Sequence, residues 1–140
     1  MNTPIEETLV LVKPDGVARN LTGEILRRIE AKGYSLVDVK LVEPDRSLRA
    51  AHYAEHAGKP FYEPLVEFME SGPIVAFRVA GNRVIEGFRA LAGTTDPTTA
   101  APGTIRGDLG RDWGSKVQQN LVHGSDSPES AARELALWFD

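Results

Sequence analysis

Short apolar runs rich in β-branched residues constrain the fold most, because their length and composition indicate strands rather than helices. The first run, residues 8–13, reads Thr-Leu-Val-Leu-Val-Lys and stops at a Pro-Asp-Gly triplet, which predicts a strand followed by a turn. A second run of the same kind occupies residues 74–80. These runs predict the strands of a sheet, and the segments between them must supply its helices.

Two further strands are expected from weaker patterns. Residues 34–43 alternate, with Val37, Val39 and Leu41 on one side, so this segment predicts a half-buried strand. The segment 116–122 predicts a last strand that stops directly before His123. The titratable ring would then face the loops at a strand end.

Helical spacing of apolar residues fills the intervals. Thr22 and Ser47 are expected to cap two helices, and Ser127 to cap a last one that begins at Pro128. Helices are expected over residues 22–32, 48–57, 61–70, 83–91 and from 128 onward. Residues 92–114 lack a regular pattern and predict a long loop of the kind that carries function.

The order of these elements is β-α-β-αα-β-α-loop-β-α, which without the helical pair is the ferredoxin-like arrangement. We therefore predict an α+β (α/β sandwich) fold with a four-stranded antiparallel sheet and helices packed on one of its faces. A doubly wound parallel sheet is the alternative, although only two βαβ units are available to build it. The length of 140 residues predicts a single domain over 1–140.

Composition excludes several classes of protein. The chain has no cysteine, which excludes disulfides and cysteine nucleophiles, and its net charge of −4 argues against a nucleic-acid partner. No apolar run approaches the roughly 20 residues of a membrane span, and the acidic start lacks the apolar core of a signal peptide. These features predict a cytoplasmic protein without membrane contact.

His123 is the strongest candidate for chemistry. An imidazole of ordinary basicity is largely neutral at pH 7, and its ring nitrogen is then a competent nucleophile toward phosphorus. Asn120, Gly124 and Ser125 supply an amide, a close backbone approach and a hydroxyl beside it. A carboxylate on the last helix would fix the tautomer of the ring; the two candidates are Glu129 and Glu134.

Cations would have to offset the charge of a phosphoryl group in transfer. Lys13 at a strand end, Arg89 at a helix end and Arg106 in the long loop are the candidates. A second chemistry is open, because His52 and His56 stand four residues apart on one expected helix, a spacing that can hold zinc. With His123 added, these residues would make a histidine-ligated metallohydrolase.

Several spaced motifs resemble those of one known family. The stretch Asn-Leu-Val-His-Gly-Ser-Asp at 120–126 looks like the N-x-x-H-G-S-D signature of nucleoside diphosphate kinases, and Lys-Pro-Asp-Gly at 13–16 resembles their first turn. Further segments match in order; they lie at 52–53, 59–61, 71–73 and 102–108. The resemblance covers nearly the whole chain and implies transfer of a γ-phosphate from a nucleoside triphosphate to a nucleoside diphosphate.

The resemblance also implies roles for individual residues. His123 would carry the phosphate in a ping-pong mechanism, with Ser125 and Glu134 supporting it. Phosphate and sugar contacts are implied for Lys13, Tyr53, His56, Arg89, Thr95, Arg106 and Asn120. Base contacts are implied for Phe61, Leu65 and Val117. Magnesium would be held through the nucleotide phosphates with no protein ligand, and the chain would form a homo-oligomer, either a hexamer or a tetramer.

One departure from the family pattern stands out. Eleven residues, 109–119, separate Gly-Asp at 107–108 from Asn120, a few more than the family pattern has. This lengthening bears on Val117, which would close on the base opposite Phe61. The alternative to an active enzyme is a catalytically silent nucleotide-binding or regulatory module of the same fold, which would bind nucleotide without exchange.

Overall fold

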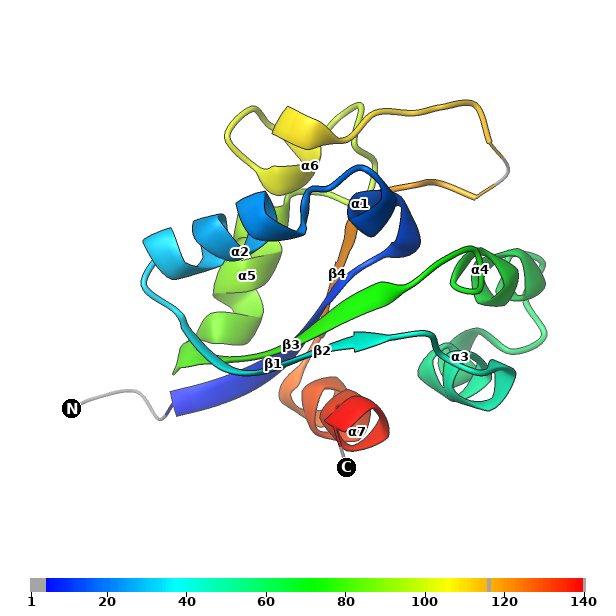
Figure 1. Cartoon of the computed structure of the whole chain (residues 1–140), viewed down its shortest axis with the longest axis horizontal. Coiled ribbons are helices and arrows are strands. Elements are labelled where there is room, and N and C mark those ends of the chain that lie inside the picture. The colour runs from blue at the N-terminus through cyan, green and yellow to red at the C-terminus, as the bar shows by residue number, and fades with distance from the viewer. Residues whose placement is uncertain (1–4, 116, 140) are drawn as a thin grey trace.

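A four-stranded antiparallel sheet with the order β2-β3-β1-β4 forms the centre of the computed structural model, which describes residues 5–115 and 117–139 (Figure 1). The strands are β1 (Ile5–Val12), β2 (Ser35–Val42), β3 (Ile74–Asn82) and β4 (Val122–Gly124). The helices are α1 (Pro14–Ala18), α2 (Thr22–Ala31), α3 (Arg46–His52), the 3-10 helix η1 (Ala54–His56), α4 (Tyr62–Phe68), α5 (Val84–Ala92), α6 (Ile105–Leu109) and α7 (Pro128–Phe139). The predicted α+β, ferredoxin-like sheet is confirmed, and the parallel alternative is wrong.

Helices cover both faces of the sheet, so the expectation of a single covered face is wrong. The reason lies in β1, where residues 9–12 are all fully buried. Val10 and Val12 pack with residues of α2 and α5, whereas Leu9 and Leu11 pack with residues of α4 and α7. Successive side chains of a strand point to opposite faces, so a strand that is apolar at every position needs cover on both.

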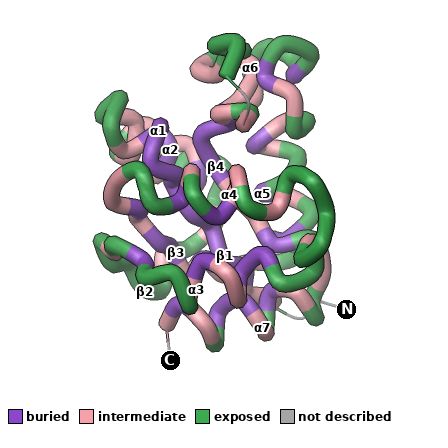
Figure 2. Tube along the Cα trace, turned by 90° about the vertical axis from the view of Figure 1, so that its right-hand side faces the viewer, coloured by how far each residue is buried: buried purple, intermediate pink, exposed green. Residues whose placement is uncertain are grey.

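Strand β2 lies at the edge of the sheet and is largely exposed (Figure 2). It was predicted to be half buried, but Val37, Val39 and Leu41 are 52%, 48% and 69% exposed. A register shift between Leu36 and Asp38 interrupts its pairing with β3. The alternating pattern found a strand correctly but could not show what covers its apolar side.

Several element boundaries differ from the prediction. The Pro-Asp-Gly triplet starts the short helix α1 rather than a simple turn, because Pro14 suits the first position of a helix. Asp45 caps α3 in place of Ser47, accepting a hydrogen bond from the Leu48 N–H at 2.8 Å. Thr22 is the first residue of α2 rather than its cap.

The region before His123 also differs. The segment predicted to be one long loop, 92–114, contains α6, which Thr104 caps by accepting from the Gly107 N–H. The last strand is short and includes His123, whereas a strand over 116–122 was expected; Lys116 lies outside the described residues. Pro128 begins α7 as predicted, and Ser127 caps it through a 3.1 Å bond from the Ser130 N–H.

Candidate active site

The pairing of β4 with β1 determines the direction in which His123 points. His123 lies opposite Leu11 in this antiparallel ladder, and directly opposite residues share a face of the sheet. Leu11 packs in the cluster that contains Leu135 and Trp138 of α7. The imidazole is therefore directed toward α7, and its neighbours Val122 and Gly124 are directed to the other face.

Glu134 of α7 is hydrogen-bonded to the His123 ring and determines which ring nitrogen carries the proton. Its Oε1 lies 2.7 Å from His123 Nε2 and accepts a second hydrogen bond from the Ser125 hydroxyl at 2.8 Å. Burial would raise the pKa of the Glu134 carboxyl, but the hydrogen bond with His123, the charge of that ring and the Ser125 hydroxyl hold it below its usual value. An ionised carboxylate only accepts, so the proton sits on Nε2 and Nδ1 keeps its lone pair. Nδ1 is then the ring atom whose lone pair is free to attack an electrophile.

Of the two predicted carboxylates, Glu134 is thus the partner of the histidine, and Glu129 is exposed. Ser125 is fully buried and is held in turn by the Leu9 N–H, which donates to its hydroxyl at 3.3 Å. The hydroxyl therefore connects β1 to Glu134. This arrangement supports the carboxylate rather than touching the pocket itself.

His52 lies against His123 on the side away from β1, with the two ring centroids 4.5 Å apart at an interplanar angle of 74°. The indole N–H of Trp138 donates to His52 Nδ1 at 3.1 Å, so a neutral His52 carries its proton on Nε2. Burial, followed by the charges of His123 and Lys13, places the pKa of His52 well below its usual value. His52 is a neutral hydrogen-bond donor beside the His123 ring.

This geometry does not support the zinc hypothesis as it was framed. His52 ends α3 and His56 lies in the separate helix η1, so the two are not on one helix. The ligand atoms that come within 4.8 Å of one another belong to His52, His123 and Glu134. In that cluster, Trp138 holds one nitrogen of His52 and Glu134 holds one nitrogen of His123, so hydrogen bonds already use these groups.

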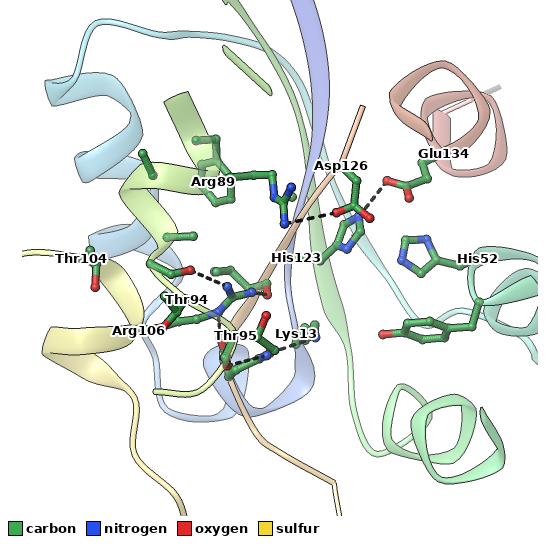
Figure 3. A pocket seen from close by; sticks show the side chains of 18 of the residues that line it. Lys13, His52, Arg89, Thr94, Thr95, Thr104, Arg106, His123, Asp126 and Glu134 are labelled. Carbon is green, nitrogen blue, oxygen red and sulfur yellow. Dashed lines mark hydrogen bonds and ion pairs between the residues drawn. The ribbon is translucent and has the colours of Figure 1, made fainter. Parts of the chain in front are cut away.

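A pocket of about 630 Å³ opens in front of His123. Lys13, Arg89 and Arg106 line it on one side of the imidazole, with His52 and Glu134 on the other (Figure 3). Arg89 is half exposed and lies 3.7 Å from the carboxylate of Asp126. Three cations from three separate segments thus line the same pocket as the His123 ring; their role toward phosphate stays a prediction.

Burial weakens the proton affinity of two of these cations. It lowers the pKa of Lys13 to about 8, with the charge of Arg106 acting in the same direction and Asp15 opposing it. Burial, followed by the charge of Arg89, lowers the pKa of Arg106 to about 10. An anion bound in the pocket would raise both pKa values again, because its negative charge would offset the repulsion among these cations.

Arg106 also has a structural task that the sequence did not reveal. Its guanidinium donates to the backbone carbonyls of Gly93, Asn120 and Val122, at 2.9, 3.0 and 2.7 Å. The side chain therefore ties the loop after α5 to the strand that carries His123. Any contact with an anion would come on top of this role.

Asn120 lies between the cations and the loop. Its Oδ1 accepts from Lys13 Nζ at 2.9 Å, and its Nδ2 donates to the carbonyl of Thr95 at 3.2 Å. Asn120 and Lys13 are both buried, so their polar groups are fixed by each other rather than by bulk water. The predicted sugar and phosphate residues are thus in direct contact.

An adjoining pocket of about 610 Å³ shares five lining residues with the first: Lys13, Tyr53, Thr95, Asn120 and His123. Its remaining lining is mostly apolar and includes Phe61, Leu65 and Val117. Phe61 is 46% exposed, and the ring of His56 lies 5.2 Å from it. An exposed aromatic face next to a cationic pocket suits a flat base attached to a phosphate chain.

The lengthened segment 109–119 keeps Val117 at this pocket. The Ser115 hydroxyl donates to the Val117 carbonyl at 2.6 Å, Gln118 donates to Asp96 at 3.2 Å, and Arg19 donates to the Leu109 carbonyl at 2.8 Å. The Trp113 ring lies 4.3 Å from the Arg111 guanidinium and 5.7 Å from that of Arg19. Residues 111–115 are all exposed, so this part of the lengthened segment lies at the protein surface.

Sequence reasoning grouped His52 with His123 only as possible zinc ligands, and it missed two residues that shape the site: Trp138, which donates to His52, and Asp15, which accepts from Leu121. Trp138 was counted only as an apolar residue of the last helix. A buried indole usually needs a hydrogen-bond acceptor, and this was the available signal. Nothing in the spacing connected Asp15 to residue 121.

Comparison with known proteins points to one family. The family model described as nucleoside diphosphate kinase matches residues 6–140. A protein of that name from Mycolicibacterium vanbaalenii is 60% identical over 135 residues, which cover 96% of each chain. Another, from Thermobifida fusca, is 58% identical over 96% of this chain and 97% of its own.

Solved structures give the same result. The halophilic nucleoside diphosphate kinase from Halobacterium salinarum, in complex with CDP, has a TM-score of 0.91 and 47% identity, and the match covers 98% of this chain and 89% of that one. The enzyme from Borrelia burgdorferi, a transition state mimic with bound vanadate and ADP, has a TM-score of 0.90 and 34% identity over 97% and 88% of the two chains.

Proposed function

Because this chain belongs to the nucleoside diphosphate kinase family and transfers phosphate from nucleoside triphosphates to nucleoside diphosphates, we propose that His123 carries the phosphate between the two half-reactions. The 2.7 Å contact between His123 Nε2 and Glu134 supports this role most strongly, because it leaves Nδ1 unprotonated at the pocket. The negative charge of Glu134 would also stabilise the ring when the phosphoryl group makes it cationic.

In the first half-reaction, Nδ1 of His123 attacks the γ-phosphorus of the triphosphate, the N–P bond forms, and the bond to the β-phosphate oxygen breaks. In the second, an oxygen of an incoming diphosphate attacks the same phosphorus and the N–P bond breaks. Lys13, Arg89 and Arg106 offset the charge on the phosphoryl oxygens throughout. No other group needs to take or supply a proton, because the Nε2 proton stays on the ring, hydrogen-bonded to Glu134.

The two adjoining pockets suggest how the rest of the nucleotide lies. The phosphates occupy the pocket of the three cations, and the base stacks on Phe61, with Leu65 beside it and Val117 opposite. Asn120 and Lys13 stand where the pockets meet, so they contact the ribose and its neighbouring phosphate. Tyr53, His56 and Thr95 line the same channel. Stacking accepts any base, so we expect low base selectivity. Of the two solved relatives, one is a complex with CDP and the other with ADP, which carry different bases.

Magnesium is the metal that this arrangement fits. The pocket is lined by cations; its carboxylates Glu55 and Asp126 lie at exposed positions, and Glu134 is engaged by His123 and Ser125, so among the described residues it offers no cage of protein oxygens. Mg²⁺ retains waters and commonly binds through substrate phosphates. It would supply charge neutralisation on the phosphates, while the side chains of this chain would orient them.

Self-association is the second part of the proposal. The apolar residues Val37, Val39 and Leu41 line an exposed edge strand, a feature that single chains usually protect. A homo-oligomer, hexameric or tetrameric, would cover them.

In the described parts of the chain, no helix has the length and hydropathy that crossing a bilayer requires. The cytoplasmic location and the single domain over 1–140 stay predictions.

An exchange assay tests the proposed role of His123. The protein is mixed with ATP, magnesium and a second nucleoside diphosphate, and formation of the second triphosphate is followed. We expect parallel-line ping-pong kinetics in the native chain and no transfer in His123→Ala. Glu129→Ala, an exposed change on α7, should retain activity and serves as the matched control. Native turnover in His123→Ala would refute the assignment, and nucleotide binding without exchange in the native chain would favour the silent module.

A further inference from the structure

Leu121 has a backbone conformation that is rare for a residue with a side chain. Its φ is +71°, and the Val122 N–H donates to the Asn120 carbonyl at 2.8 Å, across two residues. A hydrogen bond of that span with a positive φ defines the rare and strained form of the γ-turn. Such a conformation persists only where its surroundings hold it, and it concentrates at functional sites.

The start of α1 holds this turn through both polar groups of Leu121. Asp15 Oδ2 accepts a hydrogen bond from the Leu121 N–H at 3.1 Å, and the Lys13 N–H donates to the Leu121 carbonyl at 2.8 Å. Gly16 permits this approach, because a Cβ there would lie 3.1 Å from the Leu121 carbonyl oxygen and 2.8 Å from Val12. Residues 13–16 therefore contact the γ-turn at Leu121 directly and hold it in place.

The γ-turn at Leu121 separates two parts of the site. Before it, Asn120 contacts Lys13 Nζ at 2.9 Å; after it, Val122 leads directly into His123. The Arg106 guanidinium donates hydrogen bonds to the carbonyls of Asn120 and Val122, the residues on either side of Leu121. If Leu121 relaxed to a negative φ, the peptide groups on both sides would rotate, and Asn120 could not keep its contact with Lys13.

Asp15 itself is 9% exposed and is not among the residues that line either pocket. Its Oδ1 is buried and has no hydrogen-bond partner among the described residues. Burial raises the pKa of this carboxyl, and the bond from Leu121 and the charge of Lys13 oppose that rise. A buried carboxylate with one unsatisfied oxygen is costly, so its bond to Leu121 calls for a role.

We propose that Asp15 is a positioning residue for phosphoryl transfer: its carboxylate holds Leu121 in the γ-turn that places Asn120 beside Lys13 and His123 at the pocket. The proposal rests on the function proposed above for those three residues. It assigns no direct contact with nucleotide to Asp15. Its effect should therefore appear through Asn120 and Lys13, as weaker binding of the diphosphate.

Steady-state transfer from ATP to a second diphosphate, measured in three variants, tests this role. Asp15→Ala removes the acceptor, so kcat/KM should fall by about tenfold or more, with a raised KM for the diphosphate. Asp15→Asn keeps an acceptor oxygen and should stay within about threefold of the native chain. Gly16→Ala pushes the Leu121 carbonyl while Asp15 remains, and should reproduce the raised KM.

Asp45→Ala is the matched control, because Asp45 also accepts from a backbone N–H but caps α3. It should lower Tm and leave KM at the native value. Native kcat/KM in both Asp15→Ala and Gly16→Ala would overturn the proposal. Equal losses in Asp15→Asn and Asp15→Ala would also overturn it, because the acceptor oxygen would then be irrelevant. Should Asp15→Ala fail to fold, Asp15→Asn and Gly16→Ala still decide. A native chain without transfer would refute the proposed function itself.

Discussion

At the residue scale, the site depends on hydrogen bonds that assign a fixed proton to each histidine. Glu134 keeps the proton of His123 on Nε2, and Trp138 keeps that of His52 on its own Nε2. One histidine therefore presents a lone pair to the pocket, while the other remains a neutral donor next to it. Two chemically identical rings thus differ in function because of the partner each one meets.

Glu134→Gln tests the charge in this arrangement. The amide can still accept from His123, but it no longer stabilises a cationic phosphohistidine, so the rate of phosphorylation should fall by about 10–100-fold. Rapid-quench measurement of the first half-reaction with ATP checks this, and Glu129→Gln on the same helix is the control. An unchanged rate would show that the charge of Glu134 is not used.

Lys13 gives the site a pH dependence. Since burial lowers its pKa to about 8, kcat/KM should fall above that pH as the ammonium loses its proton and its hold on phosphate. The unfolded chain binds this proton more tightly, with a pKa near 10.5, so the Lys13 contribution to the free energy of unfolding rises between pH 8 and 10.5. A pH profile of kcat/KM checks the first statement, and Lys13→Arg should move the alkaline limb upward. A flat profile to pH 10 would contradict it.

At the element scale, short pieces of structure position the chemistry. Strand β4 has only three residues, yet its pairing with β1 aims His123 at α7. Helix α7 then supplies Glu134, with Leu135 and Trp138 packed beneath it. The orientation of the His123 ring therefore depends on how firmly α7 begins and packs against the sheet.

Ser127→Ala tests the start of α7. Loss of the bond from the Ser130 N–H should lower the free energy of unfolding by about 1 kcal/mol, as is usual for an N-cap. Denaturant unfolding measures this change. Ser130→Ala keeps the same backbone N–H and is the matched control, expected within about 0.5 kcal/mol of the native chain. Equal losses in the two variants would show that the cap has no special role.

The sequence predicted the elements where periodicity was strong and failed where distant contacts decide. The runs that became β1 and β3, and the Ser127-Pro128 start of α7, were correctly placed. The extent of β4 was wrong, because Leu121 is bent by bonds from Lys13 and Asp15, over a hundred residues away. Motif spacing indicated candidate residues that the structure places around two adjoining pockets, but it could not reveal that Arg106 and Asp15 hold backbone groups.

At the scale of the whole molecule, both faces of the sheet are covered and one edge is not. Val37, Val39 and Leu41 stand along β2, at the end of the sheet away from His123 on β4. A surface of this kind invites pairing with another chain. Assembly through β2 would leave the two pockets accessible.

Val39→Lys tests this edge. Placing a charge among the apolar side chains of β2 should reduce the mass of the particle in solution, because burying an unpaired ammonium is unfavourable. Light scattering coupled to size exclusion measures the mass, and Lys32→Glu, an exposed charge change outside the strand, is the control. A native mass in Val39→Lys would exclude β2 from the interface.

The position of the phosphate on the enzyme shows which nitrogen of His123 is the nucleophile. Incubation with ATP labelled at the γ-phosphate, followed by quenching in base, should give an acid-labile, base-stable label on His123, and phosphorus NMR should place it on Nδ1. That result follows from the 2.7 Å bond that keeps Nε2 protonated. A phosphate found on Nε2, or a label that persists in His123→Ala, would contradict the account.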